Sequence, residues 1–134
     1  MPANTSIAIA DGASTPVTHT YLPTKVEGSL ASWQERVSGV PIGYPTLSWS
    51  WREPSSQSPT YKLVGKLTQP KVVTTTDTTG KTVTSVDYTN LGTVELVLSA
   101  KSSKQERTDI RTLMSNALKN ATVVSIIDDL EGVW

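Results

Sequence analysis

Hydrophobic and polar residues alternate strictly in two neighbouring segments of the chain. From Thr46 to Arg52 every second residue is apolar, and a similar period of two returns from Tyr61 to Thr68. Side chains of a strand point alternately to its two faces, so each segment has one apolar and one polar face. Such strands are typical of an antiparallel sheet that is covered on one side only.

Further strand patterns lie on both sides of these segments. Two alternating runs around an Asp-Gly turn predict a β-hairpin over residues 5–21. Residues 29–37 fit either a short strand or a helical turn, and residues 86–99 fit the last strand. The prediction is a one-sided, five-stranded antiparallel sheet within residues 29–99. Threonine dominates residues 71–85, where we expect a long, exposed hairpin loop.

The last third of the chain has a helical pattern, which makes the expected fold class α+β. Ser103 followed by Glu106 is a capping-box sequence, and apolar residues then recur at helical spacing until Asn120, which is expected to end the helix. A second apolar stripe predicts another helix, closed by Gly132. The two helices are expected within residues 103–131.

Composition excludes several classes of function. The chain has 134 residues, which suits a single domain over residues 1–134, and 12 Lys and Arg residues balance 12 Asp and Glu residues. A neutral chain does not bind nucleic acid with its whole surface. There is no cysteine, so neither a disulfide nor a thiolate site can form. No apolar stretch approaches the about 20 residues that span a bilayer.

Catalysis is not expected. His19 is the only histidine, and threonines flank it in the predicted hairpin, so a surface or packing role is expected. Asp128 and Asp129 are adjacent in a predicted helix, where their side chains point about 100° apart and do not converge on a ligand. We expect no catalytic residues, no cofactor and no metal.

The polar side of the predicted sheet is a candidate binding surface. It carries three cations and two hydroxyl groups, from Arg52, Lys62, Lys66, Ser48 and Ser50. Such groups suit the phosphates and 2′-hydroxyls of RNA, although an ordinary solvated face has the same pattern. Trp49 and Trp51 point to the opposite side and are expected in the core.

The predicted core is thin, because two helices must cover a broad sheet. If the helices project beyond their own sheet, a second copy of the chain can bury them, and an obligate dimer is expected. The threonine-rich residues 71–85 are expected to serve as an assembly contact.

Three segments resemble the coat proteins of single-stranded RNA bacteriophages, the levivirus family, and the allolevivirus type in particular. They are Tyr61–Pro70, Glu106–Thr112 and Ile126–Trp134. The resemblance implies an interlocked homodimer with a continuous ten-stranded sheet. Such dimers form an icosahedral shell of the virion, usually of triangulation number three, after synthesis in the cytoplasm of the bacterial host.

The resemblance also implies that the inner sheet face binds single-stranded viral RNA. In the family this face binds a hairpin at the replicase start, which represses translation and marks the genome for packaging. Carried over by position, the contact residues are Ser48, Ser50, Arg52, Lys62, Val64, Lys66, Leu91 and Thr93. Leu91 stands where the family has a stacking tyrosine, and Val64 stands where it has a polar contact. Tyr88 or Asn90 could substitute if a bulge changes the local register.

A second interpretation remains open at this point. The chain could be a β-rich structural or adhesive module that binds protein or glycan through the threonine-rich loop, with no affinity for RNA. Assembly into particles that contain RNA distinguishes the two interpretations.

Overall fold

The computed structural model describes residues 2–133 and divides after Val97 into two compact units. The first unit is built on strands and the second on two helices. The strands are β1 (Ile7–Ala10), β2 (Thr18–Glu27), β3 (Leu30–Gln34), β4 (Thr46–Arg52), β5 (Thr60–Thr76) and β6 (Thr82–Ser99), with a 3-10 turn η1 (Pro41–Gly43) before β4. Trp134, the terminal aromatic residue of the family resemblance, lies outside the described residues.

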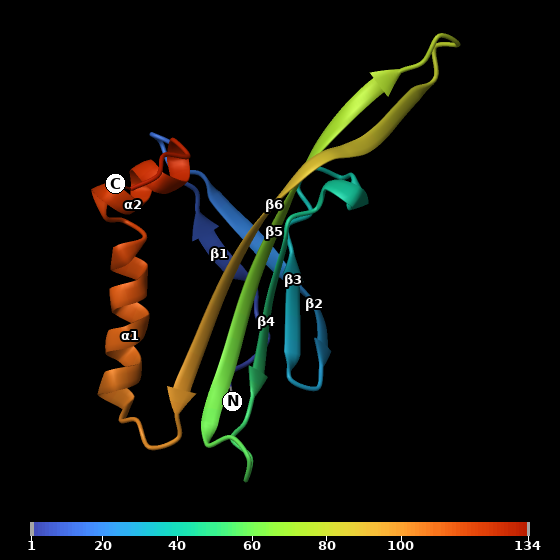
Figure 1. Ribbon diagram of the computed structural model, residues 1–134. Helices are drawn as coiled ribbons and strands as arrows, with labels where there is room; N and C mark the ends of the chain where they lie inside the picture. Colours follow the sequence, from blue (N-terminus) through green and yellow to red (C-terminus); the bar gives the residue numbers. More distant parts are fainter. Residues whose placement is uncertain (1, 134) are drawn as a thin grey trace. The chain divides into compact units, whose positions relative to one another are not determined.

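The six strands form one antiparallel sheet in chain order, from β1 to β6 (Figure 1). The prediction of an antiparallel α+β fold is confirmed, but the number of five strands is wrong. The predicted hairpin is no separate element, because β2 pairs with β1 in its first half and with β3 in its second half. Residues 29–37 contain the strand β3 and no helical turn.

Strands β5 and β6 form a long ribbon where residues 71–85 were predicted to be a loop (Figure 1). β5 continues to Thr76 and β6 begins at Thr82, so only residues 77–81 connect them. Threonine is β-branched and favours extended backbone, which explains why this segment is strand rather than loop.

Asp77 fixes the turn at the end of the ribbon. Its Oδ1 accepts hydrogen bonds from the backbone N–H groups of Thr79 and Lys81, both at 2.9 Å, and from the Thr79 hydroxyl at 2.6 Å. Gly80 has a φ of 81°, in the left-handed region where glycine is favoured. The turn is therefore ordered by its own local hydrogen bonds.

A small apolar core lies on one face of the sheet, which we call the tryptophan face because it carries Trp33 and Trp49. The buried residues are Tyr21, Ala31, Trp33 and Leu47, and Ile7 and Trp49 pack against them. Trp49 lies directly opposite Gly65 on the neighbouring strand. A Cβ atom on Gly65 would lie 2.7 Å from the Trp49 ring, so the ring covers the β5 backbone at a place where only glycine fits.

The second unit contains the helices α1 (Lys104–Ala117) and α2 (Ala121–Asp128). The predicted capping box is confirmed, since the Ser103 hydroxyl accepts from the Glu106 N–H at 3.2 Å and the Ser103 N–H donates to the Glu106 carboxylate at 2.6 Å. Both hydrogen bonds lower the pKa of Glu106, and the bond from the Ser103 backbone has the larger effect. Asn120 is the N-cap of α2, because its Oδ1 accepts from the Thr122 N–H at 3.0 Å.

The end of α2 differs from the prediction. Gly132 does not close the helix, which ends at Asp128 with Asp129 as its C-cap. The negative end of the helix dipole disfavours carboxylates there, and this explains the early end. Leu130 then adopts a φ of 57°, which is incompatible with a right-handed helix.

Replacing Gly65 with alanine tests the contact with Trp49. We expect Gly65→Ala to lower the free energy of unfolding by about 1–3 kcal/mol, because the new methyl group overlaps the ring. Urea unfolding at a fixed protein concentration measures the change. Gly92→Ala is the matched control in the same sheet, since a Cβ atom there meets nothing within 4 Å. Equal effects of the two substitutions would contradict the assignment.

Candidate nucleic-acid interface

The pairing of β4 with β5 brings the sequence-predicted polar residues together on one face. Arg52 lies opposite Lys62, Ser50 opposite Val64, and Ser48 opposite Lys66. We call this side of the sheet the serine–lysine face; on these two strands it carries Ser48, Ser50, Arg52, Lys62, Val64 and Lys66. The tryptophan face is its reverse, because Trp49 alternates with Ser48 and Ser50 along β4.

The serine–lysine face extends onto two further strands that the sequence analysis did not include. Ser48 lies opposite Ser32 on β3, and Ser32 lies opposite Lys25 on β2. With Lys66 they form a row across four strands, with a lysine at each end and two serines between. Lys25 was missed because Pro23 and a register shift between Pro23 and Lys25 interrupt the alternation along β2.

An ion pair shows which side of β6 belongs to this face. The Lys62 Nζ lies 2.9 Å from the Glu95 Oε1, so both side chains are on the same side of the sheet. Leu91 and Thr93 precede Glu95 by four and two residues on the same strand, so alternation places them on the serine–lysine face as well. Leu91 is 63% exposed.

The cations of this face differ in their partners. Lys25 pairs with Glu27 at 2.6 Å and Lys62 with Glu95 at 2.9 Å. Arg52 donates only a long hydrogen bond, of 3.4 Å, to the Ser58 hydroxyl. Within residues 2–133, neither Arg52 nor Lys66 has a carboxylate at ion-pair distance. These two side chains are the cations available for a phosphate.

The ribbon changes register between its tip and its base. The hydroxyls of Thr74 and Thr84 lie 3.5 Å apart near the tip. A regular antiparallel ladder that starts from this pair would place Lys62 opposite Leu96, yet Lys62 forms its ion pair with Glu95. The two contacts indicate a shift of one residue within the ribbon, as a β-bulge produces.

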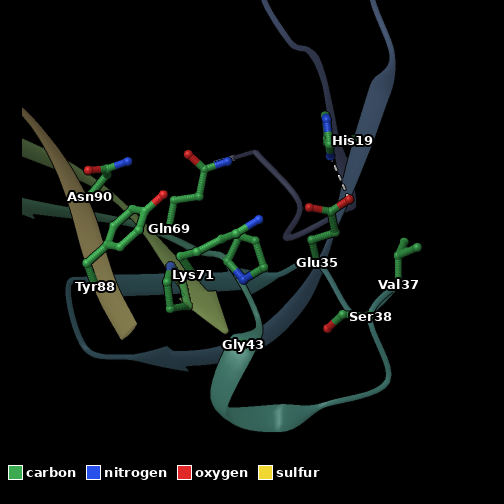
Figure 2. A pocket seen from close by; sticks show the side chains of 11 residues that line it. His19, Glu35, Val37, Ser38, Gly43, Gln69, Lys71, Tyr88 and Asn90 are labelled. Atoms are coloured by element: carbon green, nitrogen blue, oxygen red, sulfur yellow. Dashed lines mark hydrogen bonds and ion pairs between the residues drawn. The ribbon is translucent and has the colours of Figure 1, made fainter. Parts of the chain in front are cut away.

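Tyr88 and Asn90, which could replace the missing aromatic contact, lie elsewhere. They line a cavity of about 520 Å³ together with Gln69 and Lys71 (Figure 2). Gln69 and Lys71 lie two and four residues after Leu67 on β5, so they are on the same side of the strand as Leu67 and on the opposite side from Lys66. Leu67 lies opposite the core residue Leu47. The cavity is therefore on the tryptophan side, and neither residue joins the row that contains Lys66.

His19 lies at the other end of this cavity, between two carboxylates. Its Nδ1 is 2.7 Å from the Glu35 Oε1 (Figure 2). Its Nε2 is 3.1 Å from the Asp11 Oδ2. The hydrogen bond to Glu35, followed by the one to Asp11, raises the pKa of His19. The backbone N–H of Val17, and next the His19 ring, lower the pKa of Asp11. The His19 ring links the β1–β2 turn to the end of β3.

The described residues offer no other chemical centre. Across residues 2–133, no group of three or more histidine and carboxylate side chains is placed to hold a metal ion. No helix in this part of the chain has the length and hydropathy needed to cross a membrane.

A family profile described as "Levivirus coat protein" matches residues 2–134. The chain belongs to the levivirus coat protein family. This coat protein is 29% identical over 131 residues to the capsid protein of Pseudomonas phage PRR1, with 96% of this chain and 97% of that protein covered. The family resemblance noted from the sequence is confirmed, as is the prediction of a non-enzymatic capsid component of the virion.

Solved structures of phage coat proteins share the fold. The virus-like particle of bacteriophage ESE058 matches with a TM-score of 0.87 and 24% identity, covering 99% of this chain and 100% of the other. An unassembled bacteriophage coat protein dimer, described as an RNA-binding dimer, matches with a TM-score of 0.69 and 16% identity, covering 98% of both chains. Family membership decides against the adhesive module.

The His19 cluster makes stability depend on pH in a defined direction. The pKa of His19 is raised above its ordinary value of 6.5, so its stabilising contribution is fully present below that value. The contribution is lost as the pH rises through the raised pKa, because the neutral ring donates to only one of the two carboxylates.

We therefore expect the free energy of unfolding of the wild type to fall, relative to that of His19→Gln, as the pH rises from 6.5 through the raised pKa of His19. Chemical unfolding over a pH series measures both proteins. Parallel pH profiles of the wild type and His19→Gln would contradict the role of this residue.

Proposed function

We propose that this coat protein dimerises, assembles into an icosahedral shell and binds the single-stranded RNA genome on its serine–lysine face. The observation that carries the RNA assignment is the register of β4 and β5, which sets Arg52 beside Lys62 and Lys66 beside Ser48. Cations suit phosphates, and serine hydroxyls suit base edges and 2′-hydroxyls.

Repetition makes a modest local charge sufficient for binding. The chain is neutral overall, with 12 cationic and 12 acidic residues. In a shell, the free cations of many subunits face one polyanion, and their contributions combine through release of counterions and through multivalency. A coat protein dimer described as RNA-binding shares this fold, which supports RNA binding by a dimer of this chain.

Recognition of a particular hairpin is the finer part of the proposal. Ser48, Ser50 and Thr93 can make polar contacts to an operator at the replicase start and so repress translation. Leu91 and Val64 offer apolar contact only. We therefore infer that phosphate contacts contribute more to binding here than stacking of a base on β6.

Strand β6 supports the dimer. It has 18 residues and is the last strand of the sheet, so one edge presents a long row of unpaired backbone groups. Such an edge invites pairing with another strand. Antiparallel pairing of β6 with β6 of a second copy, about a two-fold axis, joins the strands β2 to β6 of both subunits into the ten-stranded sheet of the interlocked dimer.

The helices supply the apolar part of the same interface. No residue of α1 is buried, although apolar residues recur along it at helical spacing. The exposed fractions are 40% for Ile110, 64% for Leu113, 43% for Met114 and 52% for Leu118. A stripe of this kind is typical of a helix that packs against another surface, and the sheet of a second copy is the surface we propose.

The shell completes the proposal. The match to the coat protein in the virus-like particle of bacteriophage ESE058 extends over nearly the whole of both chains. This supports assembly of this coat protein as one domain over residues 1–134. A shell of triangulation number three needs subunits in slightly different environments. We propose that the ribbon of β5 and β6, which contains the register shift, is the assembly contact. The ribbon adapts to these different environments.

Removal of the two free cations tests RNA binding. In the variant Arg52→Ala plus Lys66→Ala we expect particles to assemble with at least severalfold less RNA, because the phosphates lose their charged contacts. Absorbance at 260 and 280 nm of purified particles measures the RNA content. Lys101→Ala plus Lys119→Ala removes the same charge from exposed positions outside the face and serves as control. Unchanged RNA content in the first variant would overturn the assignment.

A charge within the helix stripe tests the dimer. We expect Leu113→Asp to abolish dimers and particles, because burying an unpaired carboxylate in an apolar interface is strongly unfavourable. Size exclusion with light scattering measures the assembly state. Ser115→Asp places the same charge on another side of α1, and particles should form as in the wild type.

A further inference from the structure

We propose that Glu95 determines how readily the serine–lysine face accepts RNA, by holding the ammonium group of Lys62 and competing with RNA phosphates for it. This inference rests on the proposed RNA-binding function. It assigns to Glu95 a positioning and specificity role that neither Leu91 nor Thr93 can perform, since those side chains carry no charge.

The geometry of the pair suits an exchangeable partner rather than a permanent one. The Lys62 Nζ lies 2.9 Å from the Glu95 Oε1, and the side chains are 38% and 49% exposed. Exposed ion pairs contribute little to stability, so the pair can open without disturbing the sheet. The lysine side chain is flexible, and its ammonium can move from the carboxylate to a phosphate.

The neighbours of Lys62 explain why Glu95 matters for RNA. Arg52 lies directly opposite Lys62 across β4 and β5, so the two cations could bind one phosphate or two successive ones. With Glu95 in place, a phosphate at Lys62 meets a carboxylate of the same charge. The incoming phosphate must first displace Glu95, and Arg52 alone is immediately available at this place.

Because Glu95 must be displaced from Lys62, only an RNA that gains enough free energy from other contacts can bind there. An RNA that offers only phosphates gains little at Lys62, because it exchanges one anion for another. An RNA that also contacts the hydroxyls of Ser48 and Ser50 gains additional free energy and can open the pair. Specificity is a difference of affinities, and a competing acidic group lowers the affinity for the wrong ligands.

The same arrangement occurs at the far side of the face. Lys25, at the end of the row through Ser32 and Ser48, is paired with Glu27 at 2.6 Å. Thus two of the three lysines on the described part of this face hold a carboxylate of the same chain. Lys66, the third, has none within residues 2–133.

The test is the variant Glu95→Gln, which keeps the size of the side chain and removes its charge. Fluorescence anisotropy with a short labelled poly(U) oligonucleotide measures the dissociation constant over a series of salt concentrations. We expect roughly 1.5- to fivefold tighter binding at physiological salt, from the value of an exposed ion pair. The plot of log K against log salt should become steeper by about 0.7 per subunit, as one more phosphate contact requires.

Two further variants separate the pair from a general effect of charge. Asp87→Asn removes one negative charge from the same strand, and within residues 2–133 no cation lies at ion-pair distance from Asp87. Lys62→Gln combined with Glu95→Gln removes both partners. The inference expects no tightening in either variant. Tightening by Asp87→Asn equal to that by Glu95→Gln, or a gain that persists in the double variant, would overturn it.

The outcomes also separate this inference from the function on which it rests. Wild-type protein that binds poly(U) with salt dependence, while Glu95→Gln binds equally well, contradicts the role of Glu95 alone. Wild-type protein and Glu95→Gln that both fail to bind poly(U) contradict the RNA-binding function and the inference together. Urea unfolding midpoints of the variants confirm that the fold is unchanged.

Discussion

The fixed register between β4 and β5 is the constraint on which the rest of the structure depends. Side chains alternate with a period of two, so a slip of one residue would exchange the two faces of the sheet. The Trp49 ring prevents this slip, because it lies over Gly65 and has no room for a Cβ atom at that place. One packing contact on the apolar side thus decides that Arg52 faces Lys62 on the other side.

Features that depend on neighbouring residues could be predicted from the sequence. The alternation along residues 46–52 and 61–68 gave both faces correctly, because the pleat of a strand is a local property. The capping box at Ser103 was equally local, since the two hydrogen bonds join residues three positions apart. The face of the candidate site was therefore predictable, and so were its members on β4 and β5.

Features that depend on distant or competing contacts could not be predicted in the same way. Pro23 interrupts the alternation of apolar and polar residues, so the pattern does not indicate the second half of β2. Threonine is common in loops and in strands, so the composition does not distinguish the long ribbon from a loop. The pairing of Lys62 with Glu95 joins residues far apart in the chain. It also depends on a register shift that the local sequence pattern does not predict. The end of α2 depended on the balance between an apolar stripe and its terminal carboxylates.

The turn at Asp77 has a consequence for the order of folding. Its hydrogen bonds join residues at most four positions apart, so they form without closing a long loop. A hairpin with such a turn forms within about 1–10 μs, well before strands far apart in the chain can meet. β6 is thereby paired with its own β5 while the rest of the sheet is still forming. The nascent chain thus avoids exchanging this strand with a neighbour, and only the outer edge of β6 remains for a second copy.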